Sequence, residues 1–218
     1  MDAFEYRQSV LHCEDVPAPE LAAATGTPLY VYSAATLLDH YRKIVEAFGE
    51  LDPLICFSVK SLANVHVLRR LREAGSGFDV VSGGEVARVA RAGGDMSTVV
   101  FAGVGKTDRE IAEAIAAGVG VFNVESKAEF ENLSRLAAEA GRPVRAALRV
   151  NPDVYDARTH RYTATGKKET KFGVDIERAE RFFEAHGRDE KVRLDGIHLH
   201  IGSPIHSAEP YVQAITRT

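Results

Sequence analysis

Residues 54–64 read LICFSVKSLAN and hold the first of several strand-to-helix transitions along the chain. Apolar and β-branched residues predict a buried strand over 54–59, and helical spacing begins soon after Lys60. A lysine at the end of an apolar strand is costly to place there unless something needs its amine. Partial loss of water favours the neutral amine, which is the form that makes Schiff bases with aldehydes. The alternative is a lysine that extends its ammonium group into water.

The same unit recurs along the chain as a short β-rich run, a polar or glycine-containing turn and an amphipathic helix. The expected strands are 54–59, 78–82, 98–102, 119–124, 144–150 and 194–201, and the helices that follow them are 64–74, 83–92, 107–117, 126–140, 175–186 and 207–217. An irregular opening, a strand-like TPLYVY at 27–32 and a helix at 33–48 come before them. Strict alternation of strand and helix implies parallel strands joined by crossovers.

Doubly wound sheets and (β/α)8 barrels both fit this alternation. The chain has no Gly-x-Gly-x-x-Gly after its first strand, and its units repeat regularly, so we expect an α/β fold of the TIM-type (β/α)8 barrel class. Closure needs eight units and about six are visible, and the last helical pattern is cut off at Thr218 without a cap. We therefore expect an incomplete barrel over 33–218 and a longer parent protein.

Glycine follows most of the expected helices, which is typical of left-handed C-caps, at Gly75, Gly93, Gly118, Gly141 and Gly187. The segment VVFAGVGKTDRE (99–110) invites comparison with a phosphate-binding P-loop. That motif needs a glycine at position 100, where this chain has Val100. We instead expect a tight turn in which Thr107 and Glu110 form a capping box.

Composition excludes several classes of function. The 218 residues carry a formal net charge of −4 and lack a basic stripe, which argues against a nucleic-acid partner. No stretch approaches the length and apolarity of a membrane span, and the N-terminus has neither a basic leader nor an apolar signal core. Two cysteines are too few for a disulfide framework. We expect a soluble cytoplasmic protein.

Polar residues gather where the expected strands end, which is the edge that carries function in a barrel. They are Lys60, Asp79, Ser82, Glu85, Arg149, His198, His200 and Ser203. Each has an ordinary structural alternative, such as an N-cap for Asp79 and Ser82, a first-turn acid for Glu85, or an ion-pair partner for Arg149. The two histidines alternate onto one strand face, but no third ligand is placed for zinc, so we expect no metal site. Together these groups predict an active site.

Several motifs resemble the fold-type III pyridoxal-phosphate decarboxylases, a family that includes ornithine decarboxylase and, more distantly, alanine racemase. The matching motifs are CFSVK (56–60), GSGFDVVSGGE (75–85), FAGVGKTDREI (101–111), VFNVES (121–126), LRVNPDV (148–154), THRYTATGKKETKFGV (159–174) and GIHLHIGS (196–203). They span about 150 residues in the family's order. Within the family the resemblance is greatest to diaminopimelate decarboxylases.

This resemblance implies a role for each site residue. Lys60 is expected to hold pyridoxal 5′-phosphate covalently, with His200 stacked on its ring and Ser203 at its phosphate. Asp79 and Arg149 are expected near the cofactor, and Glu85 near the reacting centre, so that Lys60, Glu85 and His200 are the expected catalytic residues. The segment 171–173 is expected near a subunit interface, because the family forms homodimers.

The activity implied is decarboxylation of meso-2,6-diaminopimelate to L-lysine and carbon dioxide. Relatives carry the rest of the site in a C-terminal half, and residues 1–32 are expected to join a β domain there, so this piece alone is expected not to turn over. Two alternatives stay open. One is a relative acting on carboxynorspermidine, arginine or ornithine, and the other is a non-catalytic barrel module.

Overall fold

Parallel strands run through the centre of the protein in the computed structural model, which describes residues 3–154 and 172–218. In chain order they are β4 (Cys56–Ser58), β5 (Gly77–Val80), β6 (Val99–Phe101), β7 (Val121–Val124), β8 (Val144–Asn151) and β10 (Val192–His198). Each strand pairs in parallel with the next in this series. A doubly wound sheet would reverse its order at a switch point, whereas this order follows the sequence without reversal, as in a section of a barrel. The barrel prediction is confirmed.

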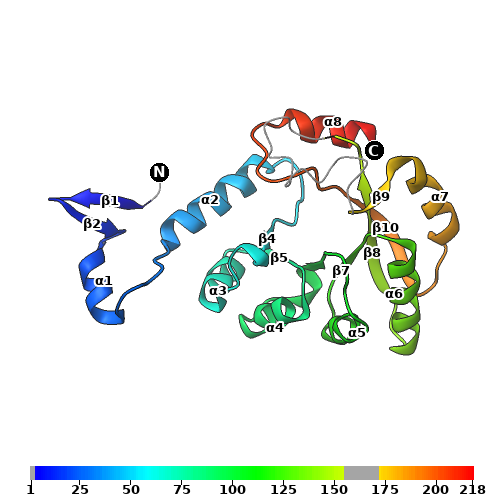
Figure 1. The fold of residues 1–218 in the computed structure, drawn as a ribbon, viewed down its shortest axis with the longest axis horizontal. Coiled ribbons are helices and arrows are strands. Elements are labelled where there is room, and N and C mark those ends of the chain that lie inside the picture. The colour runs from blue at the N-terminus through cyan, green and yellow to red at the C-terminus, as the bar shows by residue number, and fades with distance from the viewer. Residues whose placement is uncertain (1–2, 155–171) are drawn as a thin grey trace.

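Helices cover the outside of this curved sheet. They are α2 (Ala34–Ala47), α3 (Val65–Glu73), α4 (Gly83–Arg91), α5 (Asp108–Ala117), α6 (Lys127–Glu139) and α7 (Ile176–His186). A further helix, α8 (Glu209–Arg217), lies apart from them and packs in a small cluster with Val154 and Ile201. Figure 1 shows α3 to α6 following one another in an arc outside the strands, and successive members of this series touch. Each expected helix is present to within a few residues, because its apolar face repeats every three to four residues.

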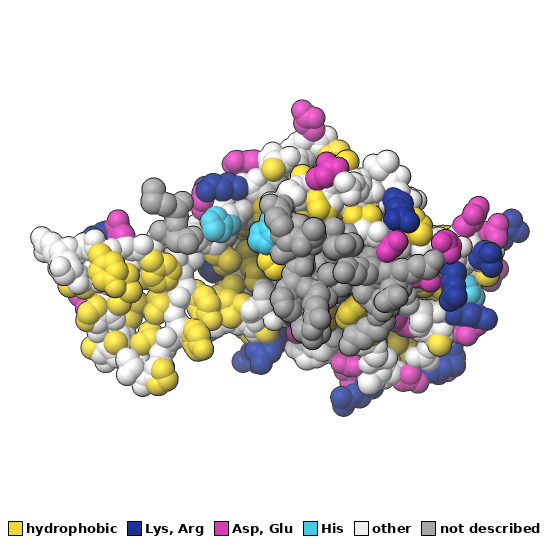
Figure 2. Space-filling view, turned by 45° about the horizontal axis from the view of Figure 1, so that its top comes forward, with side chains coloured by type: hydrophobic (Ala, Val, Ile, Leu, Met, Phe, Trp, Pro, Cys, Tyr) yellow, Lys and Arg dark blue, Asp and Glu magenta, His cyan; other side chains and the backbone are white. Residues whose placement is uncertain are grey.

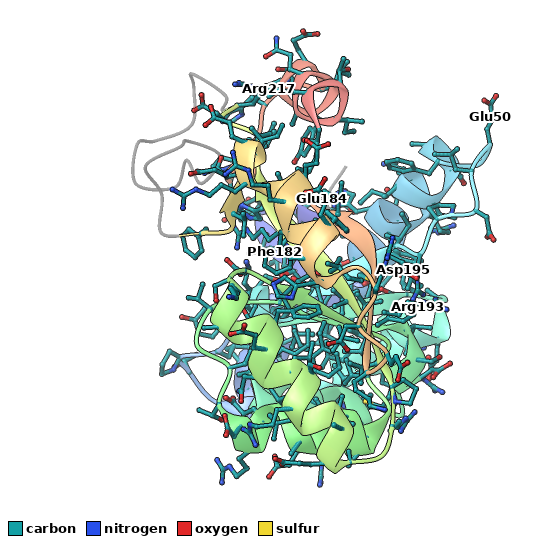
Figure 3. The ribbon with its side chains drawn as sticks, turned by 90° about the vertical axis from the view of Figure 1, so that its right-hand side faces the viewer. Glu50, Phe182, Glu184, Arg193, Asp195 and Arg217 are labelled. Carbon is teal, nitrogen blue, oxygen red and sulfur yellow. The ribbon has the colours of Figure 1, made fainter. Side chains whose placement is uncertain are left out.

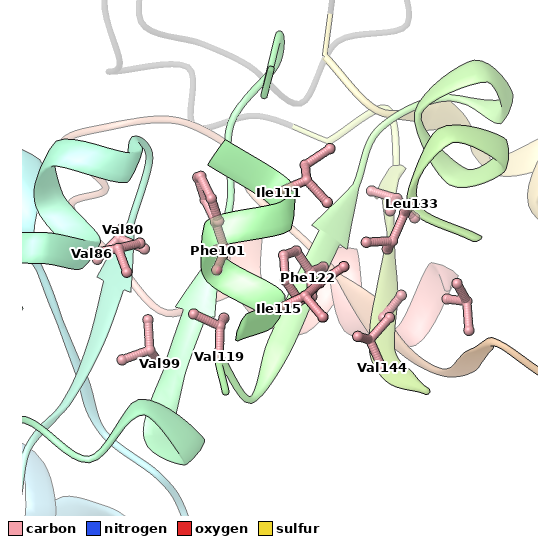
Figure 4. Close-up of a cluster of buried hydrophobic side chains, with 14 of the residues drawn as sticks. Val80, Val86, Val99, Phe101, Ile111, Ile115, Val119, Phe122, Leu133 and Val144 are labelled. Atoms are coloured by element: carbon pink, nitrogen blue, oxygen red, sulfur yellow. The ribbon is translucent and has the colours of Figure 1, made fainter. Parts of the chain in front are cut away.

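The core lies between the strands and these helices. Phe101 and Phe122 project from β6 and β7 with ring centroids 6.1 Å apart, and Ile111 and Ile115 of α5 pack in the same buried cluster. Figure 4 shows this layer of side chains between α5 and the strands. Farther along, Phe182 of α7, labelled in Figure 3, meets the ring of Phe130 of α6 edge-on, with ring centroids 5.7 Å apart. Burial of these residues fixes the helices onto the sheet.

Most of the predictions for the helix ends are confirmed. The hydroxyl of Thr107 accepts the N–H of Glu110, and the Glu110 carboxylate accepts the N–H of Thr107 in return, so the predicted capping box is present. Gly75, Gly93, Gly118 and Gly141 have positive φ as expected for left-handed caps. The prediction for Gly187 is wrong, because this residue ends α7 in a right-handed conformation.

The N-terminal segment differs from the prediction. Residues 27–32 form no strand, and no strand among residues 3–154 and 172–218 pairs with them. Backbone groups without a partner strand stay in water, and Tyr30 is 90% exposed. The supposedly irregular opening instead holds an antiparallel sheet of β1 (Phe4–Arg7), β2 (Val10–Cys13) and β3 (Val16–Pro17), followed by α1 (Ala18–Thr25).

A two-residue turn explains why this hairpin was missed. Gln8 and Ser9 join β1 to β2, and both have positive φ, which is the geometry of a type I′ turn. Asn-Gly is the sequence signal for that turn, and Gln-Ser does not provide it. A short strand β9 (Val174–Asp175), paired with the end of β8, was also missed because two residues are too few to show an alternating pattern.

Among the described residues, every helix falls short of the length and apolarity that crossing a membrane requires.

Candidate active site

A cavity of about 420 Å³ opens at the carboxyl ends of the central strands. Its chemistry comes from side chains in or just after the ends of four different strands, namely Lys60, Asp79, Arg149, His198 and His200. Parallel strands end at one edge of the sheet, which is why residues from distant parts of the sequence meet there. Ala102, Gly103 and Val104 supply an apolar and backbone wall between them.

Lys60 lies one residue beyond the predicted strand, on the 3-10 turn η1 (Val59–Ser61), and its side chain is exposed at the cavity. Asp79 of β5 lies beside it. The hydroxyl of Ser58 donates to Asp79 Oδ2 at 3.0 Å. Burial raises the pKa of Asp79, while the hydrogen bond from Ser58 and the charges of Lys60 and Arg149 act in the opposite direction.

Arg149 is held rigidly in the cavity wall. Its guanidinium Nη1 donates to both carboxylate oxygens of Glu125 at 3.0 Å, and both side chains are more than nine-tenths buried. The ring of Phe172 covers the other side of the guanidinium, 4.6 Å from its carbon. Gly173 allows this contact, because it has φ +72 and a Cβ there would lie 2.8 Å from the carbonyl oxygen of Arg149.

His198 and His200 both line the cavity as predicted, but they do not share a strand, because β10 ends at His198 and not at residue 201. Burial lowers the pKa of His198 to about 3, and the nearby charge of Arg149 adds to the effect. Burial also lowers the pKa of His200, again with help from Arg149. Both imidazoles are therefore neutral near pH 7. His198 Nδ1 is buried and has no hydrogen-bond partner within the described part of the chain.

Stability should depend on pH through His198. Above pH 6.5 the imidazole is neutral in both the folded and the unfolded chain. Between pH 6.5 and about 3 the unfolded chain binds a proton that the folded chain does not, so the free energy of unfolding should fall as the pH falls. Each unit of pKa difference corresponds to about 1.4 kcal/mol. His200 acts in the same direction and Asp79 in the opposite one.

Denaturant unfolding at pH 7.5 and pH 5 measures this effect. We expect His198→Asn to lose less stability than the wild type between these pH values, whereas His66→Asn, at an exposed position of α3, should behave like the wild type. Equal losses in His198→Asn and the wild type would contradict the prediction.

Of the eight residues predicted for the site, five line the cavity, and Ser82, Glu85 and Ser203 do not. Glu85 lies in the first turn of α4, where its carboxylate accepts the N–H of Val81 at 2.8 Å. At the start of α6 the carboxylate of Glu129 accepts the N–H of Glu125 in the same way. Ser82 accepts the N–H of Glu85 as the N-cap of α4. Ser203 is exposed in the segment between β10 and α8.

Sequence reasoning missed Glu125 and Phe172 as parts of the site. Glu125 directly follows β7, so the rule that located Asp79 and Arg149 at strand ends also points to it. Phe172 carries no such signal, because tertiary packing brings it to Arg149. Residues 159–171 of the quoted THRYTATGKKETKFGV motif lie outside the described residues.

Comparison with known proteins decides the family. The family model described as "Pyridoxal-dependent decarboxylase, pyridoxal binding domain" matches residues 34–218. The chain belongs to this family. The diaminopimelate decarboxylases of Haemophilus influenzae and Pseudomonas aeruginosa are each 45% identical to it over the whole chain, which spans 52% of their length. The chain thus spans about half the length of these curated relatives.

Solved structures agree with this membership in the pyridoxal-dependent decarboxylases. Diaminopimelate decarboxylase from M. jannaschii in complex with L-lysine has a TM-score of 0.88 at 33% identity, covering 97% of this chain and 50% of that one. The Helicobacter pylori enzyme in complex with L-lysine has a TM-score of 0.85 at 35% identity, covering 90% and 50%. A Chlorella virus arginine decarboxylase, with a TM-score of 0.76 at 21% identity, shares the fold.

The cofactor of the family is pyridoxal 5′-phosphate, as the resemblance implied. The residues of this cavity fit it. An accessible amine at Lys60 suits an aldehyde, neutral planar imidazoles suit an aromatic ring, and the fixed cation of Arg149 suits an anionic molecule.

Proposed function

We propose that the whole protein converts meso-2,6-diaminopimelate to L-lysine and carbon dioxide, and that this chain supplies its cofactor-binding barrel. The observation that carries the proposal is 45% identity, over the whole chain, to curated diaminopimelate decarboxylases. The cavity supports it, because Lys60 and His200 open onto the same space at the strand ends.

In this proposal each predicted residue has a role. Lys60 holds the aldehyde carbon of the cofactor through Nζ, His200 stacks on the ring, and Ser203 binds the phosphate. Asp79 and Arg149 lie beside the cofactor. We place Glu85 near the reacting centre, because its carboxylate accepts the N–H of Val81 and Val81 lines the cavity. When bound, the cofactor withdraws electrons from the carbon that loses carbon dioxide.

The protein's own charges prepare the cavity for this chemistry. Glu125 fixes the guanidinium of Arg149, so a positive charge stands in the wall at a set position. His198 and His200 stay neutral, which keeps further positive charge out of the wall. Ser58 orients the Asp79 carboxyl group. Contacts within the protein hold these groups in position, which lowers the cost of reorganisation.

The proposal extends to the assembly and the location of the protein. We propose a homodimer of the full-length protein in the cytoplasm, in keeping with free thiols at Cys13 and Cys56. We assign residues 1–32 to a β domain outside the barrel. Exposed apolar side chains support this assignment, because Figure 2 shows them gathered over the N-terminal segment, and Phe4, Tyr6, Val16, Tyr30 and Tyr32 are among them.

A substrate panel tests the function. Full-length protein with pyridoxal phosphate should release carbon dioxide and L-lysine from meso-2,6-diaminopimelate faster than it decarboxylates ornithine, arginine or carboxynorspermidine. Preference for one of those three would overturn the substrate assignment. Cofactor binding without carbon dioxide from any substrate would indicate a non-catalytic module instead.

A further inference from the structure

Lys106 carries a buried ammonium group outside the residues that line the cavity. Its side chain is 2% exposed. Nζ donates to the carbonyl oxygens of Gly103 and Asn123, both at 2.8 Å, and to Glu129 Oε1 at 2.5 Å. An ammonium group has three donors, so each of them has an acceptor here. Such satisfaction is what makes a buried charge tolerable.

Two of these three bonds, those to Gly103 and Glu129, connect Lys106 to the cavity along two routes. The first is short, because Gly103 is part of the cavity wall. The second passes through Glu129, whose other carboxylate oxygen accepts the N–H of Glu125 at 2.9 Å. The Glu125 carboxylate in turn holds Arg149 in the wall. Lys106 is thus connected to the guanidinium of Arg149 through Glu129 and Glu125.

Stability alone is a weak explanation for this arrangement. Replacing a buried ion pair by apolar residues of similar volume is often neutral or stabilising, so a buried pair is poor evidence of a purely structural role. Both routes from Lys106 instead end at the cavity. The glycine-rich turn around Lys106, which superficially resembles a P-loop, has its lysine turned into the protein onto these acceptors.

We propose that Lys106 is a positioning residue for the cofactor site, acting through Gly103 on the cavity wall and through Glu129 and Glu125 on Arg149. This inference rests on the proposed function only in that the cavity holds pyridoxal phosphate. Lys106 itself touches neither cofactor nor substrate. Its effect is to hold two groups beside the cofactor in position, namely the cavity wall at Gly103 and the guanidinium of Arg149.

The experiment uses full-length protein carrying Lys106→Met, which keeps an unbranched side chain only one atom shorter and removes its donors. The control is Lys127→Met, a loss of the same group from an exposed ion pair with Glu131 on α6. Two quantities are measured, namely the dissociation constant of pyridoxal phosphate and the visible circular dichroism of the cofactor at saturation. We expect Lys106→Met to weaken binding about tenfold, equivalent to about 1.4 kcal/mol, and to change the dichroism, because the cavity wall and Arg149 lose a fixed contact. Lys127→Met should change neither.

A second variant removes the risk that an unpaired Glu129 carboxylate prevents folding. Lys106→Met/Glu129→Gln carries no unpaired charge at this position. Because Lys106 and Glu129 act as one unit, we expect the double variant to bind about as weakly as Lys106→Met, without an additive loss.

The outcomes separate this inference from the proposed function. If the wild type binds pyridoxal phosphate and the Lys106 variants match its affinity and dichroism, with only a lower unfolding temperature, Lys106 is purely structural and the inference is wrong. Additive losses in the double variant would also overturn it. If the wild type itself fails to bind pyridoxal phosphate, the proposed function is wrong.

Discussion

Lys60→Ala should abolish covalent attachment of pyridoxal phosphate to the full-length protein. The physical reason is that Lys60 presents the exposed amine of the cavity, whereas the amine of Lys106 is occupied by three acceptors. Borohydride reduction followed by peptide mass spectrometry measures the attachment. In the wild type the label should be on the peptide that contains Lys60, and the peptide that contains Lys106 should stay unmodified.

Two controls make the Lys60 experiment decisive. Lys60→Ala should unfold at nearly the same denaturant concentration as the wild type, because an exposed side chain contributes little to stability. Lys127→Met, another exposed lysine substitution, should retain full labelling. Persistence of the label in Lys60→Ala would refute the assignment of Lys60 and remove the main chemical support for the proposed function.

The second large effect is expected at Glu125. Glu125→Leu should lower the free energy of unfolding by about 3–5 kcal/mol, because it leaves the buried guanidinium of Arg149 without its counter-charge. Urea unfolding of the protein without cofactor measures this loss. Glu131→Leu on α6 is the matched control, since its carboxylate belongs to an exposed pair and should contribute little.

A double variant tests whether the cost comes from the unpaired charge. Glu125→Leu/Arg149→Met removes both members of the pair, and we expect it to recover much of the lost stability. If Glu125→Leu proved as harmless as Glu131→Leu, the pair would not be fixed in the folded protein. Glu125 could then not act as the anchor of Arg149, and the second route from Lys106 to the cavity would also fail.

Local patterns predicted much of the architecture because each unit carries its own signals. The helix at 107–117 shows this clearly, since its capping box, its apolar face and its terminal glycine are all encoded within a dozen residues. The N-terminal hairpin was missed because Gln8 and Ser9 adopt a turn for which their residue types give no signal. Residues 27–32 have strand-like composition, but composition cannot supply a pairing partner.

The site was predictable to the extent that topology places strand ends together. Lys60, Asp79, Arg149 and His200 meet at one cavity for this reason. Glu85 and Ser203 were expected beside them because each follows a predicted strand, but neither lines the cavity. Glu85 binds the backbone at the start of α4, and Ser203 lies in the loop after β10. Lys106 was considered only as part of a P-loop, which Val100 excludes. Its buried contacts were missed because its partners lie 3, 17 and 23 residues away along the chain.

The amino-acid sequence by itself determined the succession of strands and helices, the barrel class and the strand ends that carry polar side chains. These follow from periodicity and from turn chemistry, which act over a few residues. Only the tertiary structure decided that Arg149 forms an ion pair with Glu125 and packs against the ring of Phe172, and that the side chain of Lys106 is buried. These contacts depend on which charged groups are buried next to one another. Packing between segments far apart in the chain determines this.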